Sequence, residues 1–150
     1  MKVKDVMTVD VKTVQSTDNL FLAACIMRDE NVGLIPVVDE GRLVGVITDR
    51  DLAVRGIAEK RPNSTEVKAL MSTVLVSATP EMNLEEAAHM MGNAQIRRLP
   101  VVEKEQLVGI LAIADLATDG EQGQMSEAMS EISEAYHDDR SNRIPNAPLH

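Results

Sequence analysis

The sequence predicts an α+β fold with α/β-type layers, made of two β-α-β-β-α repeats followed by a C-terminal helix. The first observation is an internal duplication. Shifted by 64 residues, positions 3–53 align with 67–117 without a gap and share 17 identities in 51 positions, whereas average residue usage would give about three or four. The second observation is that each copy places an amphipathic helical segment before two short apolar runs of strand length.

Each copy opens with a short lead-in, VKDVM or VKALM, and continues as an extended stretch. We expect these stretches to form the first strand of each repeat, over Val9–Val14 and Val74–Ala78. A helix follows in each copy, because Leu, Ala, Ala and Met recur at helical spacing from Leu20 and from Leu84.

The helix starts are expected at hydroxyl-bearing residues. In the first copy Ser16 or Thr17 can cap the helix, because a side-chain oxygen accepts from the first unpaired backbone N–H groups. In the second copy Thr79 is the expected cap and Pro80 the first helical residue, a position at which proline loses no helical hydrogen bond.

Two strands are expected after each helix: Leu34–Val38 with Leu43–Ile47 in the first copy, and Arg98–Val102 with Leu107–Leu111 in the second. Continuous apolar runs of this length are typical of strands that are buried on both faces. A second helix then closes each copy, beginning at about Arg50 and at about Ala114.

The repeats set the expected domain organisation. The first repeat spans 1–58, a polar linker spans 59–66, and the second repeat spans 67–118. Residues 119–150 are expected to contain a polar loop, an amphipathic helix at about 125–137 and a frayed tail. The helix carries a narrow apolar stripe of four residues: Met125, Met129, Ile132 and Tyr136. We expect this stripe to dock on its own pair or on a dimer mate, with recognition of a partner as the alternative.

Composition restricts the classes of function. The net charge of −9 disfavours binding to a nucleic-acid backbone, and the two aromatic residues, Phe21 and Tyr136, provide no base-stacking platform. Cys25 is the single cysteine, which excludes an intrachain disulfide and fits a reducing compartment. No apolar run is long enough to span a membrane, and the N-terminus lacks a signal-peptide core. We therefore expect a cytoplasmic protein with no nucleic-acid or membrane partner.

The motifs of the two copies together resemble the CBS (cystathionine-β-synthase) domain in its tandem form, the Bateman module. The resemblance rests on the openings DVMT and ALMS, the strand segments NVGLIPVVD and QIRRLPVVE, and the junctions LVGVITDRDL and LVGILAIADL. It covers 3–117 and includes small stand-alone bacterial CBS pairs. It implies pseudo-twofold symmetry, two clefts between the repeats and a disc-like homodimer. The ligands it implies contain adenosine: AMP, ADP or ATP, and in some members NAD(H), S-adenosylmethionine or cyclic di-AMP.

The junction after the second apolar run of the first copy holds the main candidate site. Thr48 and Asp51 have the spacing of a capping box, in which a hydroxyl and a carboxylate bond the first helical N–H groups, and this structural interpretation stays open. In the functional interpretation the carboxylate accepts both ribose hydroxyls and the helix start favours a phosphate. The resemblance assigns the ribose to Asp51 and the ribose or phosphate to Thr48. The duplicate junction keeps Asp115 but has Ala112 in place of the hydroxyl, which predicts a degenerate second site.

An arginine pair is the expected phosphate clamp of the first site. Arg97 and Arg98 enter a strand that is expected to be buried, where cations are costly without anionic partners. Guanidinium groups match phosphate oxygens, and the resemblance places here basic residues that reach phosphates across the repeat interface. A surface pair bridged to nearby acids is the alternative. Gly33, grouped with the degenerate site, replaces Arg97 in the first copy and leaves room for a ligand or marks a tight strand.

Seven weaker candidates complete the predicted nucleotide site: Val9, Val11, Thr13, Ile35, Pro36, Arg50 and Arg55. The aliphatic members would flank an adenine, with core packing as the alternative, and Thr13 would approach the edge of the base. Arg50 would face solvent or support Asp51, and Arg55 would reach a polyphosphate or line a dimer interface. No metal-ligand spacing, catalytic set or Walker-type glycine loop is visible, so we expect neither a metal site nor a catalytic site.

The sequence thus predicts a non-catalytic sensor that binds an adenosine-containing nucleotide, AMP or ATP above all, between the repeats. It would have one competent and one degenerate site and would need no cofactor. The partners expected are a second copy and a regulated protein of unknown identity. The alternative is a structural module that dimerises and recruits a partner without a nucleotide. An enzyme is a third hypothesis, disfavoured because the polar residues suit holding an anion rather than activating a nucleophile.

Overall fold

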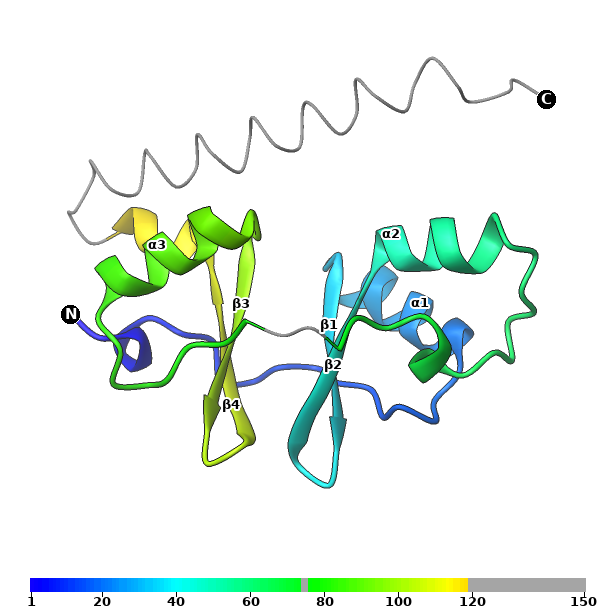
Figure 1. Cartoon of the computed structure of the whole chain (residues 1–150), viewed down its shortest axis with the longest axis horizontal. Helices are drawn as coiled ribbons and strands as arrows, with labels where there is room; N and C mark the ends of the chain where they lie inside the picture. Colours follow the sequence, from blue (N-terminus) through cyan, green and yellow to red (C-terminus); the bar gives the residue numbers. More distant parts are fainter. Residues whose placement is uncertain (74–75, 119–150) are drawn as a thin grey trace, which may run out of the picture.

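The computed structural model describes residues 1–73 and 76–118, which contain two β-hairpins side by side with helices around them (Figure 1). In chain order the elements are η1 (Val3–Asp5), α1 (Leu20–Glu30), β1 (Leu34–Asp39), β2 (Arg42–Thr48), α2 (Asp49–Asp51), η2 (Leu52–Ile57), η3 (Val67–Ala69), α3 (Leu84–Ala94), β3 (Arg98–Glu103), β4 (Gln106–Ala112) and η4 (Ile113–Thr118). The expected fold class is confirmed for the two repeats. The expected C-terminal helix lies outside the described residues.

The two hairpins have the same register, offset by 64 residues. Leu34 of β1 opposes Thr48 of β2, and Arg98 of β3 opposes Ala112 of β4. Each ladder has a register shift at the equivalent place, between the two valines of its PVV segment. β2 and β4 meet at Arg42–Gln106, which gives the strand order β1-β2-β4-β3. The four expected strands are confirmed, each one or two residues longer than expected.

Each lead-in packs in the core of the opposite repeat. Val3 of η1 is fully buried among residues of α3, β3 and β4, whereas Val67 of η3 and the neighbouring Leu70 are fully buried among residues of α1, β1 and β2. The crossing segments are the stretches that begin at Met7 and at Met71 and follow each lead-in. Two pairs of backbone hydrogen bonds hold them on the strands: Thr8 with Ile110, and Ser72 with Val46. The two units of the sequence duplication are therefore interlocked in space.

Two equivalent glycines allow the crossing segments to lie directly on the strands. A Cβ atom on Gly45 of β2 would come within 2.7 Å of the Met71 sulfur, and one on Gly109 of β4 would come within 2.8 Å of the Met7 sulfur. Both distances are shorter than real Cβ contacts, so only glycine fits without a shift of the neighbour. The interlocked packing thus explains why both copies carry glycine at this position.

The expected first strand of the first repeat, Val9–Val14, is wrong, whereas the expected strand Val74–Ala78 lies partly outside the described residues, at positions 74 and 75. The first extended stretch forms an isolated parallel bridge between Val14 and Val37 of β1, and the second forms one between Ala78 and Val101 of β3. The reason is the crossing itself: residues before Val14 leave β4, where Thr8 pairs, and reach β1 only at the end of the stretch. A chain that passes from one hairpin to the other does not follow one partner strand for long enough to form a ladder.

The expected helix caps are also wrong: Ser16 or Thr17, and Thr79 with Pro80, all precede the helices. The caps are Asn19, whose side chain accepts from the Leu22 N–H at 2.9 Å, and Asn83, whose side chain accepts from the Glu86 N–H at 2.7 Å. Asparagine caps as well as serine, so the helical spacing decides where each helix begins.

In the described residues no helix is long and apolar enough to cross a membrane.

The closing helices begin one residue earlier than expected and differ between the repeats. In the first repeat the short α2 continues into η2, a π-helical turn in which the Ala58 N–H bonds the Ala53 carbonyl at 2.9 Å. In the second repeat the closing element is the 3₁₀ turn η4. The π-helical turn is uncommon and is found frequently at functional sites.

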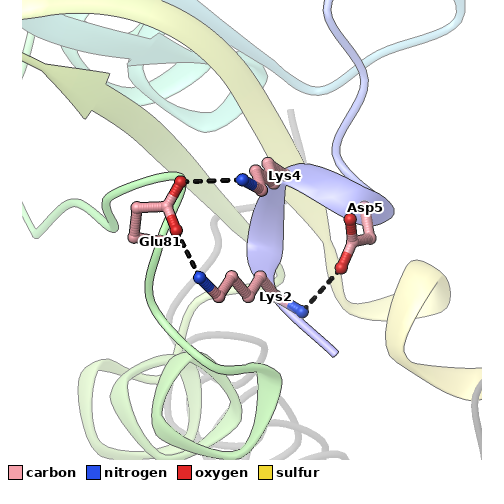
Figure 2. Close-up of polar contacts among 4 residues, drawn as sticks. All are labelled: Lys2, Lys4, Asp5 and Glu81. Carbon is pink, nitrogen blue, oxygen red and sulfur yellow. Dashed lines mark hydrogen bonds and ion pairs between the residues drawn. The ribbon is translucent and has the colours of Figure 1, made fainter.

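An ion-pair cluster holds the first lead-in against the second repeat (Figure 2). The ammonium groups of Lys2 and Lys4 both donate to the Glu81 carboxylate, and the Lys2 backbone N–H donates to Asp5 at 2.9 Å. The hydrogen bonds from Lys2 and then Lys4 lower the pKa of Glu81 to about 2, and Glu81 in turn raises the pKa of Lys4. These side chains are exposed, so salt should weaken the cluster.

Candidate functional site

The first strand-to-helix junction forms a complete capping box. Thr48 ends β2 in an extended conformation, and its hydroxyl oxygen accepts from the Asp51 N–H at 3.1 Å. The Asp51 Oδ2 atom accepts from the Thr48 N–H at 3.0 Å. The structural interpretation of this motif is therefore confirmed, and it fixes both side chains at the point where the strand turns into the helix.

The second oxygen of Asp51 is held more loosely than the first. Arg55 lies one helical turn later, with its Nε atom 3.9 Å from Asp51 Oδ1, and its Nη1 group donates to the Leu70 carbonyl at 3.1 Å. The Asp51 side chain is 16% exposed and the Arg55 side chain 56%. Asp51 thus presents a carboxylate oxygen at a half-buried position, and Arg55 ties this junction to the second lead-in.

The second junction retains half of this arrangement. The Ala112 N–H donates to Asp115 Oδ2 at 2.9 Å, as the Thr48 N–H does to Asp51. Ala112 has a methyl group where Thr48 has the hydroxyl, so residue 112 cannot supply the reciprocal acceptor that Thr48 supplies to the Asp51 N–H. The shared bond is the part that both copies use to start the closing helix.

The arginine pair belongs by register to the second hairpin. Arg98 is half-buried opposite Ala112, and the Arg97 carbonyl accepts from the Ile113 N–H at 2.8 Å. Arg97 is exposed, so the expectation that both arginines enter a buried strand is wrong for this residue. Within residues 1–73 and 76–118, no ion pair or hydrogen bond engages either guanidinium group. Their approach to Thr48 and Asp51 across the repeats stays a prediction.

Gly33 marks a close contact inside the first repeat. Its carbonyl accepts from the Asp49 N–H at 2.9 Å, and a Cβ atom at this position would come within 3.0 Å of Asp49 Oδ2. Of the two interpretations offered by the sequence, the tight strand is therefore the one that this contact supports. Arg50 is exposed, and its N–H donates to the same Asp49 side chain at 2.8 Å.

A pocket of about 220 Å³ brings together three other predicted residues. It is lined by the crossing segment and by both hairpins: Val9, Val11, Thr13, Val38, Gly41, Gln106, Leu107, Val108 and Gly109. Thr48 and Asp51 do not line it. Small-molecule sites usually enclose about 300–1,000 Å³, so this pocket alone is small for a whole nucleotide.

Sequence reasoning missed the part that β4 plays in this pocket. Gln106 to Gly109 open that strand and carry no binding motif of their own. The signal that could have found them is the close-contact glycine shared by both copies at Gly45 and Gly109, which marks where the crossing segments meet the strands.

Ile35 and Pro36, which the sequence predicts as adenine neighbours, are buried in this structure. Both side chains are fully buried, and Ile35 packs in the core of the first repeat with Val67 and Leu70. This burial supports the alternative interpretation of core packing, and contact with an adenine stays a prediction.

Comparison with known proteins shows the family of both repeats. The CBS domain model matches residues 3–55 and 67–119. The chain is 50% identical over 115 residues to the CBS domain-containing protein YhcV of Bacillus subtilis, covering 77% of this chain and 82% of that protein. It is 43% identical over 136 residues to the uncharacterized protein YlbB of the same organism, covering 89% and 92%.

Solved structures agree with the sequence relatives. The crystal structure of Hypoxic Response Protein I with two coordinated zinc ions has a TM-score of 0.73 and 31% identity, covering 78% of this chain and 97% of that one. In this chain the described residues contain no cluster of three or more His, Cys, Asp or Glu that could hold a metal. The CBS domain pair of protein MJ0100, in complex with 5′-methylthioadenosine and S-adenosyl-L-methionine, has a TM-score of 0.69 and 29% identity, covering 78% and 93%. The chain therefore belongs to the CBS domain family, as a tandem pair of CBS domains.

Proposed function

We propose that this chain is a non-catalytic regulatory module that binds an adenosine-containing nucleotide of the AMP, ADP or ATP class between its repeats. The first junction, with Thr48 and Asp51, is the competent site, and the second, with Ala112 and Asp115, is degenerate. The MJ0100 pair, which holds two adenosine-containing molecules, supports the ligand class. S-adenosylmethionine, NAD(H) and cyclic di-AMP share the adenosine group and belong in the same binding tests.

The observation that carries this proposal is the state of the Asp51 carboxylate. One oxygen is engaged by the capping bond at 3.0 Å, and the other has a 3.9 Å contact with Arg55. A ribose diol needs an acceptor of this kind, and a charged acceptor makes the stronger hydrogen bond. The first three N–H groups of the closing helix already donate to Gly33, Asp49 and Thr48, so a phosphate would be held by side chains rather than by these groups.

The arginine pair supplies the cross-repeat element of the proposal. Arg97 and Arg98 sit on the second hairpin, whereas Thr48 and Asp51 sit on the first. A nucleotide held by both would bridge the halves and favour one relative arrangement over another. The nucleotide's difference in affinity for the two arrangements would be the signal. A regulated partner would bind a homodimer of the chain and respond to the arrangement that the nucleotide favours.

Titration calorimetry on ligand-free protein tests the proposal. We expect binding of AMP or ATP to the wild-type chain and loss of most of the affinity in Arg97→Ala/Arg98→Ala, because guanidinium groups hold phosphate oxygens. Adenosine, which has no phosphate, should lose far less affinity in the same variant. Wild-type protein that binds none of these nucleotides at millimolar concentration would contradict the proposal.

The loss of the hydroxyl at Ala112 favours, for the second junction, a second candidate function: a structural module that recruits a partner without a nucleotide. The double variant Asp51→Ala/Arg98→Ala separates the two candidates. A sensor should lose the effect of nucleotide on partner binding, whereas a structural module should bind its partner equally with and without nucleotide in both forms.

A further inference from the structure

We propose that Met7 and Met71 are sites of reversible oxidation, and that a peroxide acting on their thioethers releases the crossing segments from the strands. Each of these methionines begins a crossing segment, and each is half-buried. The aligned positions carry methionine in both copies, just as Gly45 and Gly109 carry glycine. The inference concerns the interlocked packing of the repeats and does not rest on the proposed nucleotide function.

The two sulfur atoms seat the crossing segments on β2 and β4. A Cβ atom on Gly45 would lie 2.7 Å from the Met71 sulfur, and one on Gly109 would lie 2.8 Å from the Met7 sulfur, so each sulfur rests on the bare backbone of a glycine. Met71 packs against the core of the first repeat, and Met7 packs against the core of the second. The two thioethers therefore make the same contact on opposite repeats.

The backbone donors that follow the two glycines are already engaged. The Val46 N–H donates to the Ser72 carbonyl at 3.0 Å, and the Ile110 N–H donates to the Thr8 carbonyl at 2.9 Å. A sulfoxide oxygen added between segment and strand would compete for these donors or stay without a partner, and both outcomes cost free energy. Oxidation should therefore weaken the contact that the thioether makes.

The chemistry of this modification needs only a peroxide as co-reactant. The thioether sulfur attacks one oxygen of hydrogen peroxide, so that an S–O bond forms, the O–O bond breaks and the second oxygen leaves as water with both hydrogens. The sulfur loses two electrons, and the peroxide gains them. Methionine sulfoxide reductases convert the product back to methionine, which makes the change reversible.

Exposure separates these two residues from methionines at either extreme. Met27 of α1 and Met91 of α3 are 8% and 0% exposed, so a peroxide reaches them only after local unfolding. Met1 is 66% exposed, and an oxygen added there stays in water. Met7 and Met71 combine partial access to solvent with a packing role, which is the combination that an oxidation-sensitive contact requires.

Both contacts adjoin residues of the candidate site. Met71 follows Leu70, whose carbonyl accepts from Arg55 of the first junction at 3.1 Å. Gly109, on which the Met7 sulfur rests, also lines the described pocket. Oxidation of either methionine should therefore change the surroundings of this site.

Peptide mass spectrometry of the full-length protein in dilute hydrogen peroxide tests the proposal. We expect Met7 and Met71 to be oxidised at least about fivefold faster than Met91, because susceptibility follows exposure. In the oxidised protein the Thr8 and Ser72 amides, which donate to the strands, should exchange hydrogen faster than in the untreated protein.

Two double variants show whether these methionines carry the effect of oxidation. Met7→Leu/Met71→Leu keeps the side-chain volume without an oxidisable sulfur, and Met82→Leu/Met90→Leu is the matched control, since both of its methionines are half-buried against the core of the second repeat. After peroxide, and then dithiothreitol to reduce an oxidised Cys25, the wild type and the control should lose at least about 5 °C of melting temperature. Met7→Leu/Met71→Leu should lose less than half as much.

A methionine sulfoxide reductase should restore the melting temperature of the oxidised wild type. An equal loss in the two double variants, or full oxidation of Met7 and Met71 without a loss of melting temperature, would overturn the proposal. Unchanged exchange at Thr8 and Ser72 in the oxidised protein would overturn it as well. The mass spectrometry and the exchange measurement use the wild-type chain, so they decide the question even if Met7→Leu/Met71→Leu does not fold.

Discussion

The two strand-to-helix junctions share one hydrogen bond and differ in almost everything around it. Both aspartates accept from the backbone N–H three residues earlier, at 3.0 Å for Asp51 and 2.9 Å for Asp115. Only the first junction has a hydroxyl to complete the capping box, and the closing turn there is a π-helical turn rather than a 3₁₀ turn. The arginine pair, in contrast, is found only at the second hairpin.

This difference separates what the fold requires from what it does not. The aspartate-to-backbone bond starts a helix in both copies, so its presence alone says nothing about ligand binding. The hydroxyl of Thr48 and the guanidinium groups of Arg97 and Arg98 are dispensable for a CBS repeat, since the other copy lacks each of them. An internal duplication thus provides its own control for the functional interpretation of a capping motif.

The two lead-ins also differ from one another, and substitutions in them should have the largest effect on stability. Leu70 of the second lead-in is fully buried in the first repeat, whereas the aligned Val6 is only partly buried in the second. Leu70→Ala should lower the free energy of unfolding by about 2–5 kcal/mol through the cavity that it leaves. Val6→Ala should cost clearly less. Urea unfolding of both variants measures the difference, and equal losses would contradict the asymmetry of the two cores.

Substituting each junction residue by its counterpart, in Thr48→Ala and Ala112→Thr, should have an intermediate effect on stability. Thr48→Ala removes the hydroxyl that accepts from the Asp51 N–H and should destabilise the chain by about 1 kcal/mol. Ala112→Thr offers the missing acceptor at the second junction and should not destabilise it. Thermal unfolding compares the two variants, and nucleotide affinity should fall only in Thr48→Ala. If Thr48→Ala were more stable than Ala112→Thr, the role of the Thr48 hydroxyl as a helix cap would be refuted.

The smallest effect concerns the exposed cluster that holds the first lead-in. The pKa of Glu81 is lowered to about 2 by Lys2 and Lys4, so its contribution to stability is present above its usual pKa near 4.5 and is lost as the pH falls toward 2. Glu81→Gln should flatten the pH dependence of the unfolding temperature in this window. The first repeat, with Thr17 at the aligned position, has no such carboxylate. High salt should diminish the effect in the wild type, and a pH dependence unchanged by Glu81→Gln would contradict the role of the cluster.

The spacing of apolar residues, repeated in both copies, predicted the four strands and the two long helices, because each segment's own sequence determines this spacing. It failed at the helix caps, because the hydroxyl-rich segments before each helix were preferred to Asn19 and Asn83, which lie directly before the first residue of each helix. The identity of these two asparagines in both copies was a usable signal.

The exchanged lead-ins could not be predicted from the same patterns. Periodicity shows that Val3 and Val67 belong to apolar segments, yet it carries no information on which core receives them. For the candidate site, the capping spacing of Thr48 and Asp51 was readable in the sequence. The full burial of Ile35 and the exposure of Arg97 were not, because both depend on how the hairpins pack.

The central claim is that the two aspartates have unequal roles in ligand binding. Calorimetric titration of AMP and ATP into Asp51→Asn and Asp115→Asn tests it directly, since asparagine keeps one oxygen for the shared capping bond, removes the charge and replaces the other oxygen with an NH2 group that cannot accept from a ribose hydroxyl. The account predicts that Asp51→Asn weakens binding by at least about tenfold, as expected for a lost charge-assisted hydrogen bond, while Asp115→Asn changes it by less than about threefold. Equal losses in the two variants, or a larger loss in Asp115→Asn, would contradict the account.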